Sequence, residues 1–329
     1  RGLGDLYKRQ AMRDFMIRNF YKQRKDFEKS SAERNLTLTF PDTVTEIKNI
    51  PYMTDGSAAK DNTSLDTDFP PQSSKSHIRD SHRLDCYRPK KRNGELLPVI
   101  VNVHGGGLLL GSKEFNRLFC MRLSELGFLV YSVEYRLIPD CSFFDQCQDL
   151  ACAMDFLKTR ISSDNGDLSH VYAVGDSGCA CLLTYTAALQ HAPAVARAAG
   201  VTPSSLHINA LGLISGMFYT TKKDKIGLFL PKYLYGKNYK KSAFAPFVNP
   251  EHPDIVKALP PCFLVTSHND YLKRYTLQFE KALARYQVPH DLLNFPKNPK
   301  LTHAFSVFEP ELDESLQTMK SMIDFLQKY

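Results

Sequence analysis

The sequence lacks the long apolar runs and the paired cysteines that mark several protein classes. None of its apolar runs approaches the roughly 20 residues that a membrane-spanning helix needs, so no stable membrane insertion is expected. The eight cysteines are scattered, and none of them forms a C-x-x-C pair. Most lie inside apolar segments, which favours buried, reduced thiols over a disulfide framework. We therefore expect a cytoplasmic protein without a metal site.

A basic surplus is also missing from most of the chain. The formal net charge is +7, from 42 Lys and Arg against 35 Asp and Glu. Residues 1–34 alone carry ten basic and five acidic residues, so the remainder is nearly neutral and a nucleic-acid partner is not expected. We recognise no secretory signal in these residues and expect none, although the chain begins at Arg1 and not at Met. The length of 329 residues fits one large α/β domain with an insertion, or two small domains.

Strands and helices are predicted to alternate over most of the chain. Apolar, β-prone runs predict strands at 43–52, 82–87, 97–103, 128–135, 171–176, 206–216, 262–267 and 292–295. Helices are expected at 114–126, 145–161, 179–189, 275–286 and 310–327. This order predicts a mostly parallel sheet with helices on both faces. Residues 54–80 are polar and predict a long surface loop or a partly disordered segment.

Two segments depart from this alternation. Residues 4–30 predict an amphipathic helix, with Lys and Arg opposite an apolar stripe. The stripe comprises Met12, Phe15, Met16, Phe20 and Phe27. The helix can pack on the main body or lie on a membrane surface, and we favour packing on the body. Residues 218–253 are rich in Lys, Tyr and Phe, and an insertion there would form a lid over the sheet edge.

We accordingly divide the chain into four parts. Residues 1–42 form an N-terminal helical cap segment, and 43–217 the first part of the α/β core. Residues 218–258 are a cap insertion, and 259–329 the second part of the core.

The chain is organised around Gly175-Asp-Ser-Gly178, where a strand stops and a helix follows at once. So sharp a reversal strains its central residue and lifts that side chain clear of the sheet. Gly175 and Gly178 are small enough for the turn to close. Ser177 then lies at a helix N-terminus, where free N–H groups and the dipole favour an oxyanion. This is the position that a serine nucleophile needs, although serine is also a common helix N-cap.

A glycine triplet, His104-Gly-Gly-Gly107, directly follows the apolar run 97–103. Successive glycines let a backbone approach a ligand closely and direct its N–H groups inward. We expect the N–H groups of Gly105, Gly106 and Gly178 to form an oxyanion hole.

Two later segments offer a base and an acid. Asp270 follows the strand at 262–267, and His303 follows the last strand. The carboxyl ends of parallel strands meet at one sheet edge, and Ser…Asp…His is the chain order of an α/β-hydrolase triad. His303 would take the proton of Ser177, while Asp270 would orient the imidazole. His268 and His290 remain rivals for the base.

Together these residues resemble the hormone-sensitive-lipase-like branch of the α/β-hydrolases, from about Leu97 to the C-terminus. The matching motifs are His104-Gly-Gly-Gly107, Tyr135-Arg-Leu-Ile-Pro139, Gly175-Asp-Ser177, Asp270-Tyr-Leu-Lys273 and His303-Ala-Phe305. The resemblance implies ester hydrolysis, and a cap built from the N-terminal helix and an insertion before the acid strand. Cys179 departs from the family, which usually has Gly there, and Tyr271 stands where Pro is usual.

We therefore expect a serine carboxylesterase that cleaves short- to medium-chain acyl esters through an acyl-enzyme, without a cofactor or metal. A small-molecule receptor on the same scaffold, or an amidase or peptidase, stays an alternative. The small-molecule ester is the expected partner, and a homodimer is left open. Substrate contacts are expected from His104, Gly107, Leu108, Asp176, Phe218 and Tyr219.

Overall fold

A computed structural model describes residues 3–53, 81–91 and 93–329 of the chain. Its centre is an eight-stranded sheet in the order β1-β2-β4-β3-β5-β6-β7-β8. The strands are β1 (Val44–Pro51), β2 (Arg83–Pro89), β3 (Leu97–Val103), β4 (Leu129–Val133), β5 (Gly166–Asp176), β6 (Ala210–Ile214), β7 (Cys262–Ser267) and β8 (His290–Phe295). β2 pairs antiparallel with both β1 and β4, and every pairing from β4 to β8 is parallel. The sheet is thus mostly parallel, as the alternation of strands and helices predicts.

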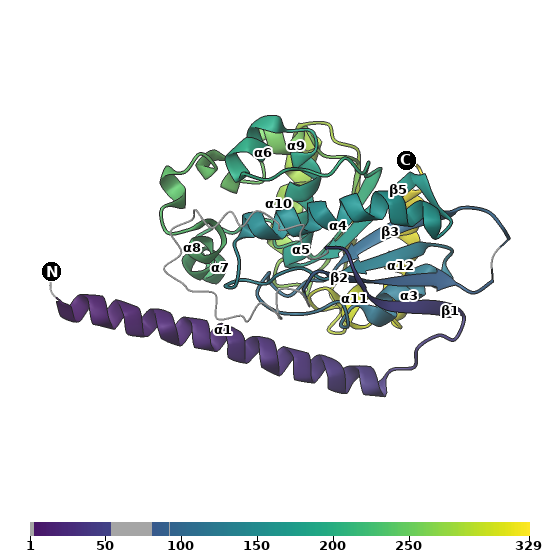
Figure 1. Cartoon of the computed structure of the whole chain (residues 1–329), viewed down its shortest axis with the longest axis horizontal. Helices are drawn as coiled ribbons and strands as arrows, with labels where there is room; N and C mark the ends of the chain where they lie inside the picture. Colours follow the sequence, from purple (N-terminus) through teal and green to yellow (C-terminus); the bar gives the residue numbers. More distant parts are fainter. Residues whose placement is uncertain (1–2, 54–80, 92) are drawn as a thin grey trace.

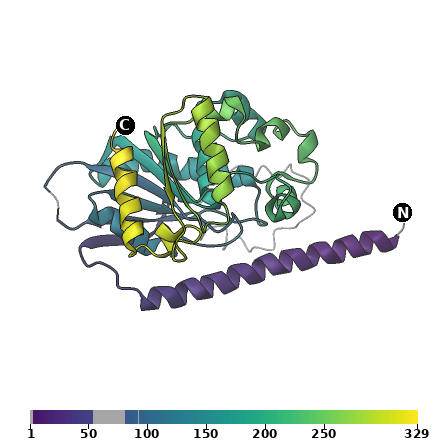
Figure 2. The same ribbon diagram turned by 180° about the vertical axis from the view of Figure 1, so that it is seen from behind.

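Helices cover both faces of this sheet (Figures 1 and 2). α4 (Phe143–Ser163), α5 (Gly178–Leu189) and α10 (Lys273–Arg285) share one core, and α3 (Arg117–Glu125) and α12 (Asp313–Leu326) share the other. Neighbouring strand residues face opposite cores, as a pleated strand requires. In β3, Val99 and Val101 belong to the first core and Ile100 to the second. Burial on both faces explains why β3 is a continuous apolar run.

Most predicted elements differ from the observed ones only at their ends. β3 and β7 have the expected bounds, whereas β6 and α3 are shorter than expected. Two short helices were not predicted, α6 (Pro193–Ala199) and α11 (Phe305–Phe308). The predicted loop at 54–80 lies outside the described residues.

The N-terminal helix α1 (Leu3–Thr37) is longer than the predicted 4–30, and it runs along one side of the molecule (Figure 1). Only part of its expected stripe packs on the body. Phe20 is buried with its ring 5.1 Å from that of Tyr233, and Phe27 contacts Phe115. Met12 and Phe15 are 64% and 60% exposed. The packing interpretation therefore holds for the C-terminal half of the stripe and is wrong for its first two members.

The segment expected as a cap insertion consists of short helices. They are α7 (Lys225–Phe229), α8 (Pro231–Tyr235) and α9 (Pro253–Val256), with 3₁₀ turns at Tyr239–Lys241 and Ala245–Val248. The division of the chain into core and cap parts stays a prediction. Within the described parts of the chain, no helix has the length and apolar content needed to cross a bilayer.

Candidate active site

Ser177 occupies the sharp turn between β5 and α5. Its φ of 53° and ψ of −120° are rare for a residue with a side chain, which is the strain expected of such a reversal. A Cβ atom at Gly175 would lie 3.0 Å from the carbonyl oxygen of Cys179 and 2.8 Å from a methyl of Leu183, so the turn leaves little room for any side chain at this position. Ser177 is the N-cap residue of α5, yet its hydroxyl caps no helix N–H. Its Oγ instead lies 2.9 Å from His303 Nε2.

The structure brings the three expected triad residues into one hydrogen-bonded chain. His303 Nδ1 lies 2.8 Å from Asp270 Oδ1, on the opposite side of the ring from Ser177. The two rival histidines lie elsewhere. His268 is exposed, and the ring of His290 contacts Glu280 and a main-chain carbonyl.

The carboxylate of Asp270 is buried and held by several donors. Leu272 N donates to Oδ1 at 2.9 Å, and the hydroxyl of Thr266 donates to Oδ2 at 3.1 Å. Burial disfavours the charged form, but the hydrogen bond and charge of His303 outweigh it and hold the pKa of Asp270 below its usual value. An ionised Asp270 is the form that can stabilise an imidazolium during proton transfer.

Two positioning side chains were missed by the sequence reasoning, and both come from strand ends. Thr266 lies in β7, next to the acid loop. Ser215 directly follows β6, and its hydroxyl accepts a hydrogen bond from Ala304 N at 3.1 Å. Ala304 has a φ of 51°, so this bond fixes an unusual backbone immediately after His303. Their places at the ends of adjacent parallel strands were the available signal.

In the oxyanion loop, residues 104–113, several carbonyl groups accept hydrogen bonds, while the N–H groups of Gly106 and Gly107 have no acceptor among the described residues. Gly106 O accepts from Leu109 N and Leu110 N, both at 3.1 Å. Leu108 O accepts from Ile138 N at 2.9 Å and from a side-chain amide at 3.0 Å. Among the described residues, no acceptor takes the N–H of Gly106 or Gly107. Such a loop keeps its donors available for a ligand.

The expected role of Gly105 as an oxyanion donor is wrong. Its N–H donates to Asp176 Oδ1 at 3.0 Å, so that group is already used. Gly107 is the alternative donor, because its N–H has no acceptor among the described residues and a Cβ atom at Gly178 would lie 3.1 Å from the Cα of Gly107. The loop therefore packs directly against the first residue of α5, whose N–H has no partner within the helix.

Three residues of this region that were predicted to contact the substrate have almost no exposed surface in this structure, and their substrate contact stays a prediction. Asp176 is 1% exposed and holds both Gly105 N and the amide of Asn116, which donates at 3.1 Å. His104 is 1% exposed and Leu108 is fully buried. Their observed contacts support the oxyanion loop.

The two aromatic residues expected in the cap, Phe218 and Tyr219, lie in different surroundings: Phe218 is buried in the core, and Tyr219 borders a cavity. Phe218 is 1% exposed and stacks on Phe279 at 4.3 Å between ring centroids, which is the environment of a core residue, and its substrate contact stays a prediction. Tyr219 borders a cavity of about 270 Å³, together with Glu251 and Gln278. Its hydroxyl donates to Glu251 at 2.7 Å. None of the triad residues lines that cavity.

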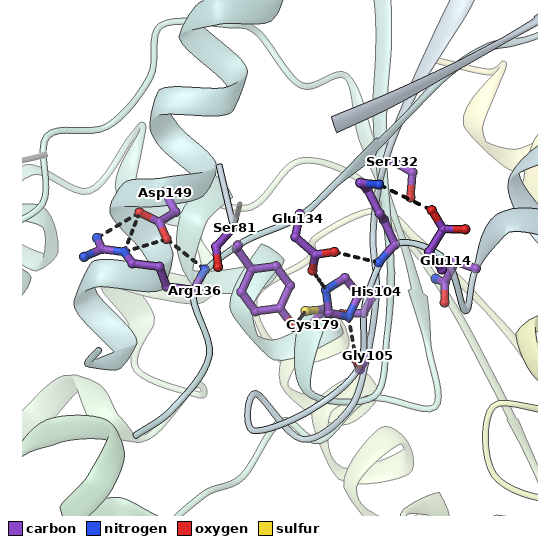
Figure 3. Close-up of polar contacts among 12 residues, drawn as sticks. Ser81, His104, Gly105, Glu114, Ser132, Glu134, Arg136, Asp149 and Cys179 are labelled. Atoms are coloured by element: carbon purple, nitrogen blue, oxygen red, sulfur yellow. Dashed lines mark hydrogen bonds and ion pairs between the residues drawn. The ribbon is translucent and has the colours of Figure 1, made fainter. Parts of the chain in front are cut away.

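Glu134 joins the two ends of the oxyanion loop (Figure 3). Its Oε1 lies 2.6 Å from His104 Nε2, and its Oε2 accepts from Lys113 N at 3.1 Å. His104 Nδ1 lies 2.8 Å from Gly105 O. Both ring nitrogens thus face acceptors, and only the doubly protonated imidazolium donates to both. Burial disfavours this charge, but Glu134 outweighs it and raises the pKa of His104 above its ordinary value.

Glu134→Gln should therefore change how stability depends on pH. A raised folded-state pKa means that the His104–Glu134 pair stabilises the fold fully below the ordinary histidine value of about 6.5, and that this contribution is lost as pH rises through the folded pKa. At pH 6 the variant should be less stable than wild type by about 1.5–3 kcal/mol, the order of a hydrogen bond to a charged group. The difference should shrink by pH 9. Urea unfolding at both pH values measures this, and an equal difference at both would contradict a charged His104.

Cys179, two residues after Ser177, has a structural contact that explains its presence. Its thiol donates to the hydroxyl of Tyr135 at 2.9 Å, and that hydroxyl donates to His104 O, also at 2.9 Å. Burial raises the pKa of the Cys179 thiol well above its usual value, so the thiol stays protonated. A protonated, buried thiol is a poor nucleophile.

Among the described residues, no group of three or more His, Cys, Asp or Glu side chains is arranged to hold a metal ion.

Comparison with known families agrees with this geometry. Residues 100–306 match a family model described as the alpha/beta hydrolase fold. The chain is an α/β-hydrolase. The match begins within β3 and includes the oxyanion loop, Ser177, Asp270 and His303, and it confirms both the family resemblance and the predicted fold class.

Individual relatives of this α/β-hydrolase are distant. A "Probable isoprenylcysteine alpha-carbonyl methylesterase" of Arabidopsis thaliana is 30% identical over 199 residues, which are 58% of this chain and 42% of that protein. The versiconal hemiacetal acetate esterase of Dothistroma septosporum is 25% identical, over 65% of this chain and 69% of that one. The chain spans less than half of the length of the methylesterases that it matches. The crystal structure of esterase B from Lactobacillus rhamnosis superimposes with a TM-score of 0.82 at 22% identity, covering 97% of this chain and 96% of the other.

Proposed function

We propose that this α/β-hydrolase is a serine esterase that cleaves short- to medium-chain carboxylic esters through an acyl-enzyme. The main support for the proposal is the hydrogen-bonded series of three side chains: Ser177 Oγ lies 2.9 Å from His303 Nε2, and His303 Nδ1 lies 2.8 Å from Asp270 Oδ1. A serine hydroxyl is a weak nucleophile unless a base within hydrogen-bond reach takes its proton. Here the base is within reach, and a buried carboxylate orients it.

The proposed reaction forms and breaks one bond to the carbonyl carbon at a time, and His303 carries the proton in each step. Ser177 Oγ bonds to the ester carbonyl carbon while its proton passes to His303 Nε2, and the carbonyl π electrons move onto the oxygen. The resulting oxyanion accepts from the N–H groups of Gly106, Gly107 and Gly178. The carbon–oxygen bond to the alcohol then breaks, and His303 gives its proton to the departing alkoxide. Water repeats the sequence on the acyl-enzyme and releases the acid.

The surroundings of His303 and the named relatives support an ester substrate. Tyr271 is 73% exposed, and its ring lies 4.5 Å from the His303 ring, so the approach to the base is aromatic. Aromatic surfaces suit the apolar groups of an ester. The matched relatives are named a methylesterase and an acetate esterase. Both names specify small groups on one side of the ester bond.

A panel of p-nitrophenyl acetate, butyrate and octanoate, assayed beside the matching acetanilide, tests the proposal. We expect turnover of all three esters with kcat/KM highest for acetate or butyrate, and far slower turnover of the anilide. Comparable anilide turnover would instead identify an amidase. A protein that binds these esters tightly without turning them over would be a receptor, and the esterase proposal would then be wrong.

A further inference from the structure

Besides its packing through Phe20 and Phe27, helix α1 sends two arginines to main-chain carbonyls of the loops around the candidate active site. Arg24 contacts the oxyanion loop, and Arg34 contacts the segment that follows His303. In Figures 1 and 2 the helix runs outside the sheet and its covering helices. It contributes no strand to the sheet and no triad residue, so the contacts of these two arginines call for a separate explanation.

Arg24 satisfies three acceptors from two segments. Its Nε donates to Leu109 O at 3.1 Å, one Nη to Ile138 O at 2.7 Å, and the other Nη to Asp140 Oδ2 at 2.9 Å. The hydroxyl of Tyr21, one turn earlier on α1, donates to the second oxygen of Asp140. The side chains of Arg24 and Asp140 are both 15% exposed. Because Arg24 and Asp140 are both partly buried and Tyr21 holds the other oxygen of Asp140, the guanidinium is held in one orientation.

The carbonyl that Arg24 holds belongs to the turn that presents the unpaired glycine donors. Leu109 N donates to Gly106 O, and Gly107 lies between them. Ile138, the second carbonyl bound by Arg24, donates its own N–H to Leu108 O. Arg24 therefore fixes the oxyanion loop directly through Leu109 and indirectly through Ile138.

Arg34 acts in the same way on the other side of the site. Its two Nη atoms donate to Phe115 O at 3.1 Å and to Phe308 O at 2.6 Å, and its guanidinium lies 4.6 Å from the centroid of the Phe115 ring. The Phe308 ring packs against Phe115 at 4.8 Å and lies 6.4 Å from the His303 ring. Both acceptors are main-chain carbonyls, so the hydrogen bonds of Arg34 hold the backbone at Phe115 and Phe308 and do not neutralise a charged side chain.

We propose that α1 positions the hydrolytic site from outside the core, with Arg24 holding the oxyanion loop and Arg34 holding the segment after His303. The inference deepens the proposed esterase function and rests on it. Oxyanion donors act only when they lie about 2.7–3.1 Å from the developing charge, and small displacements of positioned groups reduce rates strongly. A loosened loop therefore lowers transition-state stabilisation more than it lowers substrate binding.

Arg24→Ala is the direct test, with Arg18→Ala as the matched control, because Arg18 is an exposed arginine on the same helix. We expect kcat for p-nitrophenyl butyrate to fall about tenfold, less than the ~10²–10³ for complete loss of an oxyanion donor. KM should stay within about twofold, since the interactions that bind the substrate before the reaction are unaffected. The Ki of a trifluoromethyl ketone, whose adduct with Ser177 carries an oxyanion, should rise in step with the fall in kcat. Arg18→Ala should leave all three unchanged.

Arg24→Lys keeps the charge but can reach fewer of the three acceptors, so it should recover part of the loss. It also serves as the test if Arg24→Ala does not fold. Arg34→Ala should lower kcat by a similar factor. The two arginines are ten residues apart, about 15 Å along a helix, and share no acceptor, so their effects on kcat should multiply in the double variant.

Several results would overturn the inference. A folded Arg24→Ala with the kcat and Ki of the Arg18→Ala control would show that α1 does not position the loop. A rise in KM alone would show a binding role instead. Active-site titration with a phosphonate separates a lower rate per site from fewer folded sites. Wild-type protein that hydrolyses no ester would contradict the proposed function itself, which is a different outcome from full turnover in Arg24→Ala.

Discussion

Replacing Ser177 by Ala should lower ester turnover by about 10⁴- to 10⁶-fold, because no acyl-enzyme can then form. The residual rate comes from the oxyanion donors and from substrate binding, which the substitution leaves in place. The Ser177 hydroxyl caps no helix N–H, so its loss should change the unfolding temperature little. kcat/KM for p-nitrophenyl butyrate, measured beside thermal unfolding, checks both expectations.

Cys179 provides the matched control for this variant. It is a second potential nucleophile only two residues away, but its thiol is buried against Tyr135. Cys179→Ala should keep most of the activity, with a loss confined to the changed support of the loop through Tyr135. If Ser177→Ala lost less than about tenfold while Cys179→Ala abolished turnover, the nucleophile would have been assigned to the wrong residue.

The turn at Ser177 could be predicted from sequence because everything that forces it is local. An apolar strand, a buried helix and the flanking Gly175 and Gly178 lie within one continuous segment. The structure adds that a Cβ atom at Gly178 would lie 3.0 Å from Leu108 N. The small residue therefore serves the approach of the oxyanion loop as well as the turn, and that contact joins segments about 70 residues apart.

Which N–H groups of the oxyanion loop are free could not be predicted from the sequence. Three consecutive glycines predict free N–H groups but do not tell which of them the protein itself uses. Gly105 was assigned as a donor, yet its N–H is taken by Asp176, a residue that looked like part of the substrate site. The pairing depends on how β3 and β5 lie side by side, with Val103 opposite Gly175. Register of this kind is not readable from either segment alone.

The residues of the substrate pocket are hard to predict from the sequence for a related reason. Phe218 is a predicted contact because it is an aromatic residue of the expected cap insertion, but aromatic content does not distinguish a pocket from a core. The structure stacks Phe218 on Phe279 of α10. Arg24 was not singled out at all, because its three acceptors lie 85 to 116 residues further along the chain. Contacts of such long range leave no periodic signal in the sequence.

His303→Ala should lower ester turnover about as much as the loss of Ser177, by about 10⁴- to 10⁶-fold, because the two residues act as one unit. Without His303 the Ser177 proton has no acceptor, and the leaving alkoxide has no proton donor. His268→Ala is the control, since His268 is exposed and lies two residues from Asp270 in the same loop. It should retain nearly full activity. Should His268→Ala be the damaging change, the base has been misassigned.

The double variant Ser177→Ala/His303→Ala gives the sharper form of this test. Residues that depend on each other for one step are strongly non-additive, so the second substitution should cost little once the first is made. A double variant close to either single one would therefore show that His303 acts through Ser177, as the 2.9 Å contact between them indicates. Multiplied losses would mean that His303 serves catalysis by a route that does not pass through the Ser177 hydroxyl, and the proton path proposed for this site would be wrong.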